Sequence, residues 1–130
     1  MIHLDTNVLI ALPLLARQRH PLAERLRKGE AVGVSALAWF EYACGPVAEA
    51  EQQLVRAAIG SQIMPVDEAT AERAATLFNA TGRKRTLRTD SLIAATAILA
   101  NAELASFNAA DFKPFVEHGL RLTSVEGASY

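Results

Sequence analysis

Ten consecutive residues, 91–100, carry no charge. A helix that is apolar on every side is stable only where other elements cover it, so this segment predicts a central, buried helix. The whole chain has 51% hydrophobic and 21% charged residues, which is the balance of a folded protein. Any architecture for these 130 residues must therefore enclose one helix between other layers.

Short apolar runs alternate with helical patterns along the rest of the chain. We expect strands at residues 2–4, 31–34, 62–66, 103–106 and 120–125, with helices between them. Strands that alternate with helices predict a parallel sheet covered on both faces. The expected fold class is α/β, a three-layer α/β/α sandwich with a central, mainly parallel sheet. Residues 1–130 are expected to form a single domain.

Charge and composition limit where such a chain can act. The net charge of −1 gives no general attraction to nucleic acid, so such contact needs a local patch. No apolar run approaches the roughly 20 residues that span a membrane. The first residues lack the basic and long apolar regions of a signal peptide. The single cysteine, Cys44, allows no internal disulfide. We expect a cytoplasmic protein without membrane contact.

Four carboxylates stand where strands end or helices begin: Asp5, Glu41, Asp90 and Asp111. In open parallel sheets, ligands bind beyond the carboxyl ends of the strands, so one end of the sheet can gather all four. Each of three has a simpler interpretation. Asp5 and Asp90 stand at helix starts, where a carboxylate can cap the helix or interact with its dipole. Asp111 can be an ordinary acid of the loop expected around it.

Glu41 is harder to explain as a surface residue. It is the only charge between Ala36 and Cys44, and it is four residues from Leu37 on an apolar stripe. An unpaired carboxylate there is costly, so we expect a metal ion or a water-filled cleft beside it. Clustered carboxylates without soft ligands select Mg²⁺ or Mn²⁺, which can activate water and stabilise charge on a phosphodiester. The sequence leaves open whether one ion binds or two.

Four motifs, in this order, resemble those of PIN-domain nucleases, and among these the VapC toxins. They are Leu4-Asp5-Thr6-Asn7-Val8-Leu9-Ile10, Ser35 with Glu41-Tyr42-Ala43-Cys44-Gly45, Asp90-Ser91-Leu92-Ile93-Ala94-Ala95-Thr96-Ala97, and Ser106-Phe107-Asn108-Ala109-Ala110-Asp111-Phe112. The resemblance runs from residue 2 to about residue 125. Ala38, Ser91 and Ser106 depart from the residues frequent in these motifs, but none of the departures removes an acid.

The resemblance implies an endoribonuclease that uses Mg²⁺ (or Mn²⁺) and a metal-activated water, and that acts as the toxin of a toxin–antitoxin pair. It also implies a homodimer and inhibition by a cognate antitoxin protein. The residues that it implies as catalytic and metal-binding are Asp5, Glu41, Asp90 and Asp111, and those that shape the site are Thr6, Asn7, Ser35 and Asn108.

A basic segment precedes the third acid. Its charges are Arg83, Lys84, Arg85 and Arg88, and we expect them in a loop. A solvated loop is one interpretation. The other is contact with RNA phosphates, since the segment lies immediately before Asp90. Two aromatic residues, Trp39 and Phe40, are expected in the core or on a surface that receives the antitoxin.

Other functions compete with a toxin ribonuclease. A PIN-type RNA-processing nuclease without a toxin role would have the same acids. An inactive PIN-like binding module is a further alternative, although four intact acids argue against it. A phosphate-receiver switch domain is also doubly wound, but it needs a phosphoacceptor aspartate near a central strand end. Residues 42–66 contain no aspartate, which counts against that class.

Overall fold

The computed structural model describes residues 1–126 and contains a five-stranded sheet. Its strands are β1 (Ile2–Leu4), β2 (Val32–Ser35), β3 (Ile63–Met64), β4 (Glu103–Ser106) and β5 (Arg121–Ser124). The strand order is β3-β2-β1-β4-β5, and every neighbouring pair is parallel. The predicted parallel sheet is therefore confirmed, with β1 in its centre.

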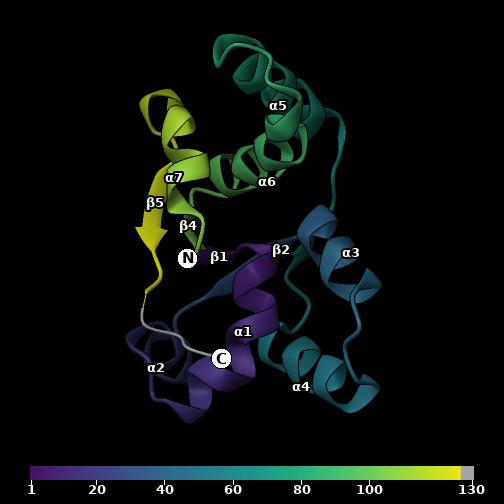
Figure 1. The fold of residues 1–130 in the computed structure, drawn as a ribbon, viewed down its shortest axis with the longest axis vertical. Coiled ribbons are helices and arrows are strands. Elements are labelled where there is room, and N and C mark those ends of the chain that lie inside the picture. Colours follow the sequence, from purple (N-terminus) through teal and green to yellow (C-terminus); the bar gives the residue numbers. More distant parts are fainter. Residues whose placement is uncertain (127–130) are drawn as a thin grey trace.

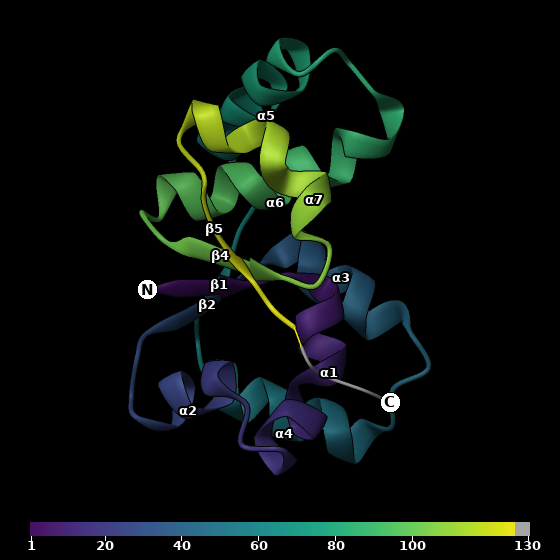
Figure 2. The ribbon, with the colours of Figure 1, turned by 60° about the vertical axis from the view of Figure 1, so that its left-hand side comes forward.

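Helices cover both faces of this sheet (Figures 1 and 2). They are α1 (Thr6–Arg17), α2 (Pro21–Arg27), α3 (Ala36–Cys44), α4 (Glu49–Ile59), α5 (Glu68–Ala80), α6 (Arg88–Leu99) and the short α7 (Ala109–Phe112). Helices α1, α2 and α4 lie below the sheet in Figure 2, and α5, α6 and α7 lie above it. This is the expected α/β/α sandwich. No helix within residues 1–126 is long and apolar enough to cross a membrane.

The charge-free segment forms the central part of α6, as predicted. Its small residues Ala94, Ala95 and Ala97 are fully buried, which lets the helix lie close to the sheet and to α5. Within residues 91–100, only Leu99, the last residue of α6, is largely exposed, at 45%. The helix begins at Arg88, earlier than the sequence suggested. Asp90 therefore lies within the first turn and does not open the helix.

Two segments expected as loops are partly helical. A 3-10 turn (Arg85–Leu87) leads directly into α6, so Arg88 is a helical residue. Asp111 lies in α7, which continues into a second 3-10 segment (Lys113–His118). The reason is the same in both places: the buried side chains of Leu87, Phe112 and Phe115 hold these short segments against the core. The loop prediction is wrong for these residues.

His3 is buried in the central strand. Its side chain is 1% exposed, and neither ring nitrogen has a hydrogen-bond partner. Burial, together with the positive N-terminus, lowers its pKa from 6.5 to about 4. On the neighbouring strand, a Cβ atom at Gly33 would lie 2.7 Å from His3 Nε2. The absence of a side chain at residue 33 therefore makes room for the imidazole.

His3→Leu should become more stable relative to wild type as the pH falls. The folded-state pKa of His3 is about 4 and the unfolded value is 6.5. Between these two pH values the unfolded chain binds a proton at His3 and the folded chain does not. The free energy of unfolding of the wild-type protein therefore falls by up to about 3 kcal/mol as the pH drops from 6.5 to 4, whereas leucine does not titrate. Thermal melts of both proteins from pH 7.5 to pH 4 measure the difference. A difference in Tm that does not change with pH would contradict this account, and His118→Gln is the control for loss of a histidine.

Candidate active site

The parallel sheet brings the ends of β1, β2 and β4 to one edge. Asp5 follows β1 directly, Ser35 ends β2, and Ser106 ends β4. Asp5 is 6% exposed and uses both carboxylate oxygens. The Thr6 backbone N–H donates to Oδ1 at 2.8 Å, and the Ser106 hydroxyl donates to Oδ2 at 2.7 Å. Asp5 therefore does cap α1, and it is also fixed in orientation by the neighbouring strand.

The pKa of Asp5 is raised above its usual range. Burial is the largest cause, and the negative charge of Asp111 adds to it. The hydrogen bonds from Ser106 and Thr6 act in the opposite direction, because they stabilise the ionised carboxylate. Asp5 is thus a buried acid whose negative charge is only partly compensated by the chain.

Asp90 shows that the four acids face a common region. Its pKa is raised to about 6, first by burial and then, in decreasing order of size, by the negative charges of Asp5, Asp111 and Glu41. These acids come from α1's start, α3, α6 and α7, so they meet only in the folded chain. We call this group of four carboxylates the acid edge. Its members lie within electrostatic range of one another.

Glu41 is an exposed residue, so the prediction of a costly carboxylate on a buried apolar stripe is wrong. Helix α3 buries Ala38 and Tyr42, while Leu37 is only half-buried against the core, so the side that Glu41 shares with Leu37 is the edge of the packed face. The Glu41 carboxylate instead accepts a hydrogen bond from the Thr6 hydroxyl at 3.0 Å. This contact joins α3 to the start of α1 and holds Glu41 toward the acid edge.

The residues predicted to shape the site make different contacts. Asn7 accepts a hydrogen bond from the Phe107 backbone N–H at 3.3 Å, which ties the start of α1 to the loop after β4. Ser35 accepts from the Leu37 N–H at 3.2 Å and caps α3. Asn108 is exposed, and its side chain makes no capping hydrogen bond to α7. Its contribution comes through its backbone.

Ser106 is the functional candidate that sequence reasoning did not assign. It is fully buried, and its hydroxyl accepts from the Asn108 N–H at 2.9 Å while donating to Asp5. One hydroxyl therefore connects the fourth motif to the first acid. The available signal was a small polar residue at the end of a strand, directly after the apolar residues Leu104 and Ala105.

The acid edge fits a hard cation in donor chemistry but forms no closed ligand set. Its donors are all carboxylate oxygens, and their mutual repulsion favours a positive ion among them. Within residues 1–126, however, no three His, Cys, Asp or Glu side chains lie close enough together to hold a metal. Mg²⁺ keeps several waters and commonly binds only one or two carboxylates directly, so the donor set remains suitable.

The basic segment lies on the surface and leads into the end of α6 that carries Asp90. Arg83, Lys84, Arg85 and Arg88 are all exposed. The Arg83 side chain donates to Asn79 Oδ1 at 3.1 Å, and the Arg88 guanidinium lies 5.9 Å from the Phe78 ring centroid, so both are held by α5. In Figure 2 the α5–α6 connection projects on the same side as α3 and α7.

Comparison with known proteins identifies the family. The model of the PIN domain matches residues 2–114, which include the four acids and the basic segment. The chain belongs to the PIN domain family. No curated protein sequence matches this PIN domain.

Solved structures share the fold of this PIN domain. A chain of a toxin–antitoxin complex from Klebsiella pneumoniae is 28% identical, with a TM-score of 0.65, and the match covers 87% of this chain and 91% of that one. FitAcB from Neisseria gonorrhoeae is 22% identical, with a TM-score of 0.66 and coverage of 95% and 97%. VapBC2 from Rickettsia felis, bound to a promoter DNA fragment, is 22% identical, with a TM-score of 0.64 and coverage of 97% and 100%.

Asp90→Asn should stabilise the metal-free protein at neutral pH. The folded-state pKa of Asp90 is about 6 and its ordinary value is 3.8. Ionisation therefore costs the wild-type fold stability as the pH rises through this window, whereas asparagine does not titrate. Thermal melts in EDTA should show a gain in Tm that is absent near pH 4 and complete above about pH 7.

The opposite outcome has a clear meaning. If Asp90→Asn melts below wild type in EDTA at pH 7, then the charge serves mainly the α6 dipole and the acid edge is not under repulsion. Glu68→Gln is the matched control, because Glu68 is an exposed acid in the first turn of α5. Its neutralisation should give no gain in Tm.

Proposed function

We propose that this PIN domain is a metal-dependent endoribonuclease and the toxin of a toxin–antitoxin pair. The observation that carries the proposal is the acid edge, where three carboxylates raise the pKa of Asp90 through their charge. Membership in the PIN domain family supports nuclease chemistry. The toxin role is supported by relatives from toxin–antitoxin complexes, including the Klebsiella pneumoniae complex at 28% identity.

The acids would hold Mg²⁺ or Mn²⁺ directly or through water. When bound, the ion would supply an activated water and neutralise charge that develops on the phosphodiester. The chain itself orients the donors. Ser106 and Thr6 fix both oxygens of Asp5, and the Thr6 hydroxyl holds Glu41. A cation would also relieve the repulsion around Asp90, so its binding should stabilise the folded state.

Purified protein, free of any antitoxin, should cleave RNA with Mg²⁺ or Mn²⁺ and stop on chelation. Glu41→Gln should lower the cleavage rate about 100-fold or more, the scale on which loss of one electrostatic group affects catalysis. It should leave the melting temperature in EDTA nearly unchanged, because Glu41 is exposed and bonds only to Thr6. Gel-based cleavage assays and thermal melts measure both quantities.

Glu72→Gln removes an exposed acid of α5 and should cleave at the wild-type rate. If the wild-type protein cleaves RNA as fast in excess EDTA as it does with Mg²⁺ or Mn²⁺, the mechanism is not metal-dependent. No cleavage of any RNA, with or without metal, would favour an inactive binding module. Cleavage without growth inhibition on expression would favour an RNA-processing nuclease over a toxin.

We also propose that the basic segment contacts RNA phosphates. Replacing Arg83, Lys84 and Arg85 together with alanine should weaken RNA binding and reduce the magnitude of its salt slope by about 2, since about 0.7 counterion is released per phosphate contact on a single strand. Fluorescence anisotropy at several salt concentrations measures the slope. A control that removes Arg17, Arg19 and Lys28 should retain the wild-type slope; equal slopes in all three proteins would identify the basic segment as a solvated loop.

An apolar groove supports an antitoxin partner. Adjoining hollows between α1, α2 and α4 share Leu12, Ala16 and Ala58, and Arg17 and Arg27 lie beside them. Leu54 is 69% exposed at this groove, which is unusual for a large aliphatic side chain. A groove of this kind suits an amphipathic helix with acidic residues on its edges. We therefore propose that the antitoxin binds here.

Leu54→Asp should reduce co-purification with the product of the neighbouring gene when both are co-expressed. The aspartate places a charge in the groove without disturbing the core, since the side chain is exposed. Val116→Asp, in the second 3-10 segment, is a matched control at 46% exposure. Equal loss of the partner in both variants would argue against the groove as its binding site.

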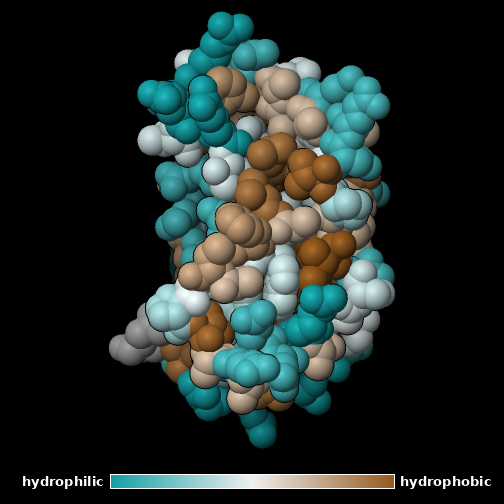
Figure 3. Space-filling model, turned by 90° about the vertical axis from the view of Figure 1, so that its right-hand side faces the viewer, coloured by the Kyte–Doolittle hydropathy of each residue, from teal (hydrophilic) through white to brown (hydrophobic). Residues whose placement is uncertain are grey.

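The homodimer implied by the family resemblance is a further part of this proposal. Apolar residues Val66 and Leu99 are exposed near the edge strand β3, at 41% and 45%. The proposed contact surface is this apolar region beside β3. Figure 3 shows a further apolar strip along the centre of the face that carries α3 and α4, which is not assigned to the dimer. Light scattering of the purified chain measures its molar mass in solution, and a stable monomer would contradict the proposed homodimer.

A further inference from the structure

Helix α3 forms a ridge between the acid edge on one side and a hollow lined by Trp39 on the other. Successive residues of a helix are turned by about 100°. Since Ala38 and Tyr42 are on the buried side, Phe40 lies opposite them and Trp39 and Glu41 lie on the two flanks. Phe40 is 62% exposed, Glu41 is exposed, and Trp39 is half-buried. One flank thus carries an acid, the other carries the indole, and an exposed phenyl ring stands between them.

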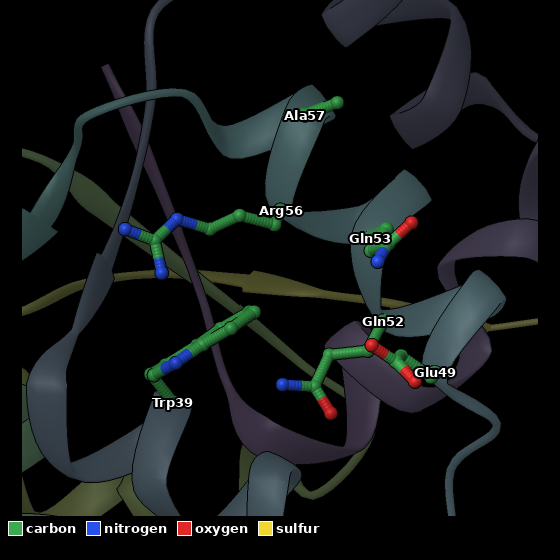
Figure 4. Close-up of a pocket in the computed structure, with 6 residues that line it drawn as sticks. All are labelled: Trp39, Glu49, Gln52, Gln53, Arg56 and Ala57. Carbon is green, nitrogen blue, oxygen red and sulfur yellow. The ribbon is translucent and has the colours of Figure 1, made fainter.

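The hollow on the Trp39 flank has a volume of about 370 Å³ and lies between α3 and α4 (Figure 4). The Arg56 guanidinium lies 5.4 Å from the indole ring centroid, above the ring in Figure 4. Tyr42 packs against the same indole, with ring centroids 5.2 Å apart, and fixes its position. Gln52 and Glu49 add a carboxamide and a carboxylate to the lining. We call this site the Trp39 hollow.

An aromatic plane, a guanidinium and hydrogen-bonding edge groups together match a nucleobase. Proteins bind single-stranded nucleic acid by stacking bases on aromatic side chains and on arginine. The apolar groove around Leu54 has no aromatic lining, and it lies on the other flank of α4. A protein segment is therefore better suited to that groove, and a base is better suited to the Trp39 hollow.

We propose that Phe40 and Trp39 form a stacking track for single-stranded RNA, which leads from the acid edge over α3 into the Trp39 hollow. This rests on the proposed function, because the track serves a substrate only if the acid edge cuts RNA. A helix is about 10–12 Å across, so a few nucleotides connect the two flanks.

The hollow also discriminates between bases. Glu49 is a hydrogen-bond acceptor only, and it pairs with the exocyclic amino group of cytosine, whereas uracil presents a carbonyl oxygen at the same position. Arg56 can lift from the indole to cover a stacked base, since its side chain is exposed. The track therefore favours cytosine over uracil at the nucleotide in the hollow.

Trp39 is the only tryptophan of the chain, so its fluorescence reports on the hollow directly. Short oligocytidine should quench this emission saturably in EDTA, where chelation of the metal prevents cleavage, and oligouridine should do so with lower affinity. Phe40→Ala should bind oligocytidine about fivefold more weakly or worse, the usual effect of losing one base–aromatic stack. Val116→Ala removes an exposed apolar side chain outside α3 and α4, in the second 3-10 segment, and should bind as wild type does.

Fluorescence anisotropy of labelled oligocytidine separates the possible failures. Binding without a change in Trp39 emission, or equal affinities of Phe40→Ala and Val116→Ala, would overturn the track. Equal affinities for oligocytidine and oligouridine would overturn the role of Glu49. If the wild-type protein cuts RNA but Trp39 emission does not change on RNA binding, the stacking track is wrong and the proposed function stands. If the protein neither binds nor cuts RNA, both the stacking track and the proposed ribonuclease function are wrong. If Phe40→Ala binds RNA normally but loses a protein partner, the ridge is a protein-binding surface.

Discussion

Repulsion among carboxylates at one end of a parallel sheet is the constraint on which the rest of this structure depends. Burial and three neighbouring negative charges raise the pKa of Asp90 to about 6, so the fold holds an arrangement that is unfavourable when every acid is ionised. Such an arrangement persists only where the surrounding structure over-determines it. Here the parallel register of β1, β2 and β4 fixes the positions from which the acids extend.

Hydrogen bonds across the chain hold these acids in place. Ser106 at the end of β4 and Thr6 at the start of α1 determine the orientation of Asp5, while the Thr6 hydroxyl reaches Glu41 on α3. The loop after β4 is joined to Asn7 through the Phe107 backbone. The buried α6 completes the arrangement, because its small side chains let the helix approach closely and carry Asp90 to the edge. Site and scaffold are thus parts of one network.

Much of this could be predicted from sequence, for identifiable reasons. The charge-free residues 91–100 predicted a covered helix, and the alternation of apolar runs predicted the parallel sheet. The position of Asp5 between a strand and a helix followed from the predicted boundaries, whereas α6 begins two residues before Asp90 and not at it. Glu41 was assigned to a buried stripe, because helix periodicity alone does not reveal which side packs on the core; Ala38 and Tyr42 decide that in the folded chain. The role of Ser106 was missed, since its bond to Asp5 joins residues 101 positions apart.

The central claim is that the acid edge binds a divalent cation, and a titration with Mn²⁺ followed by electron paramagnetic resonance tests it most directly. Bound Mn²⁺ loses its free-ion signal, so binding is measured without any cleavage assay. The account predicts uptake by wild type, loss of uptake in Asp5→Asn, and unchanged uptake in Asp67→Asn, whose acid caps α5 away from the site. No uptake by wild type, or equal loss in both variants, would contradict it.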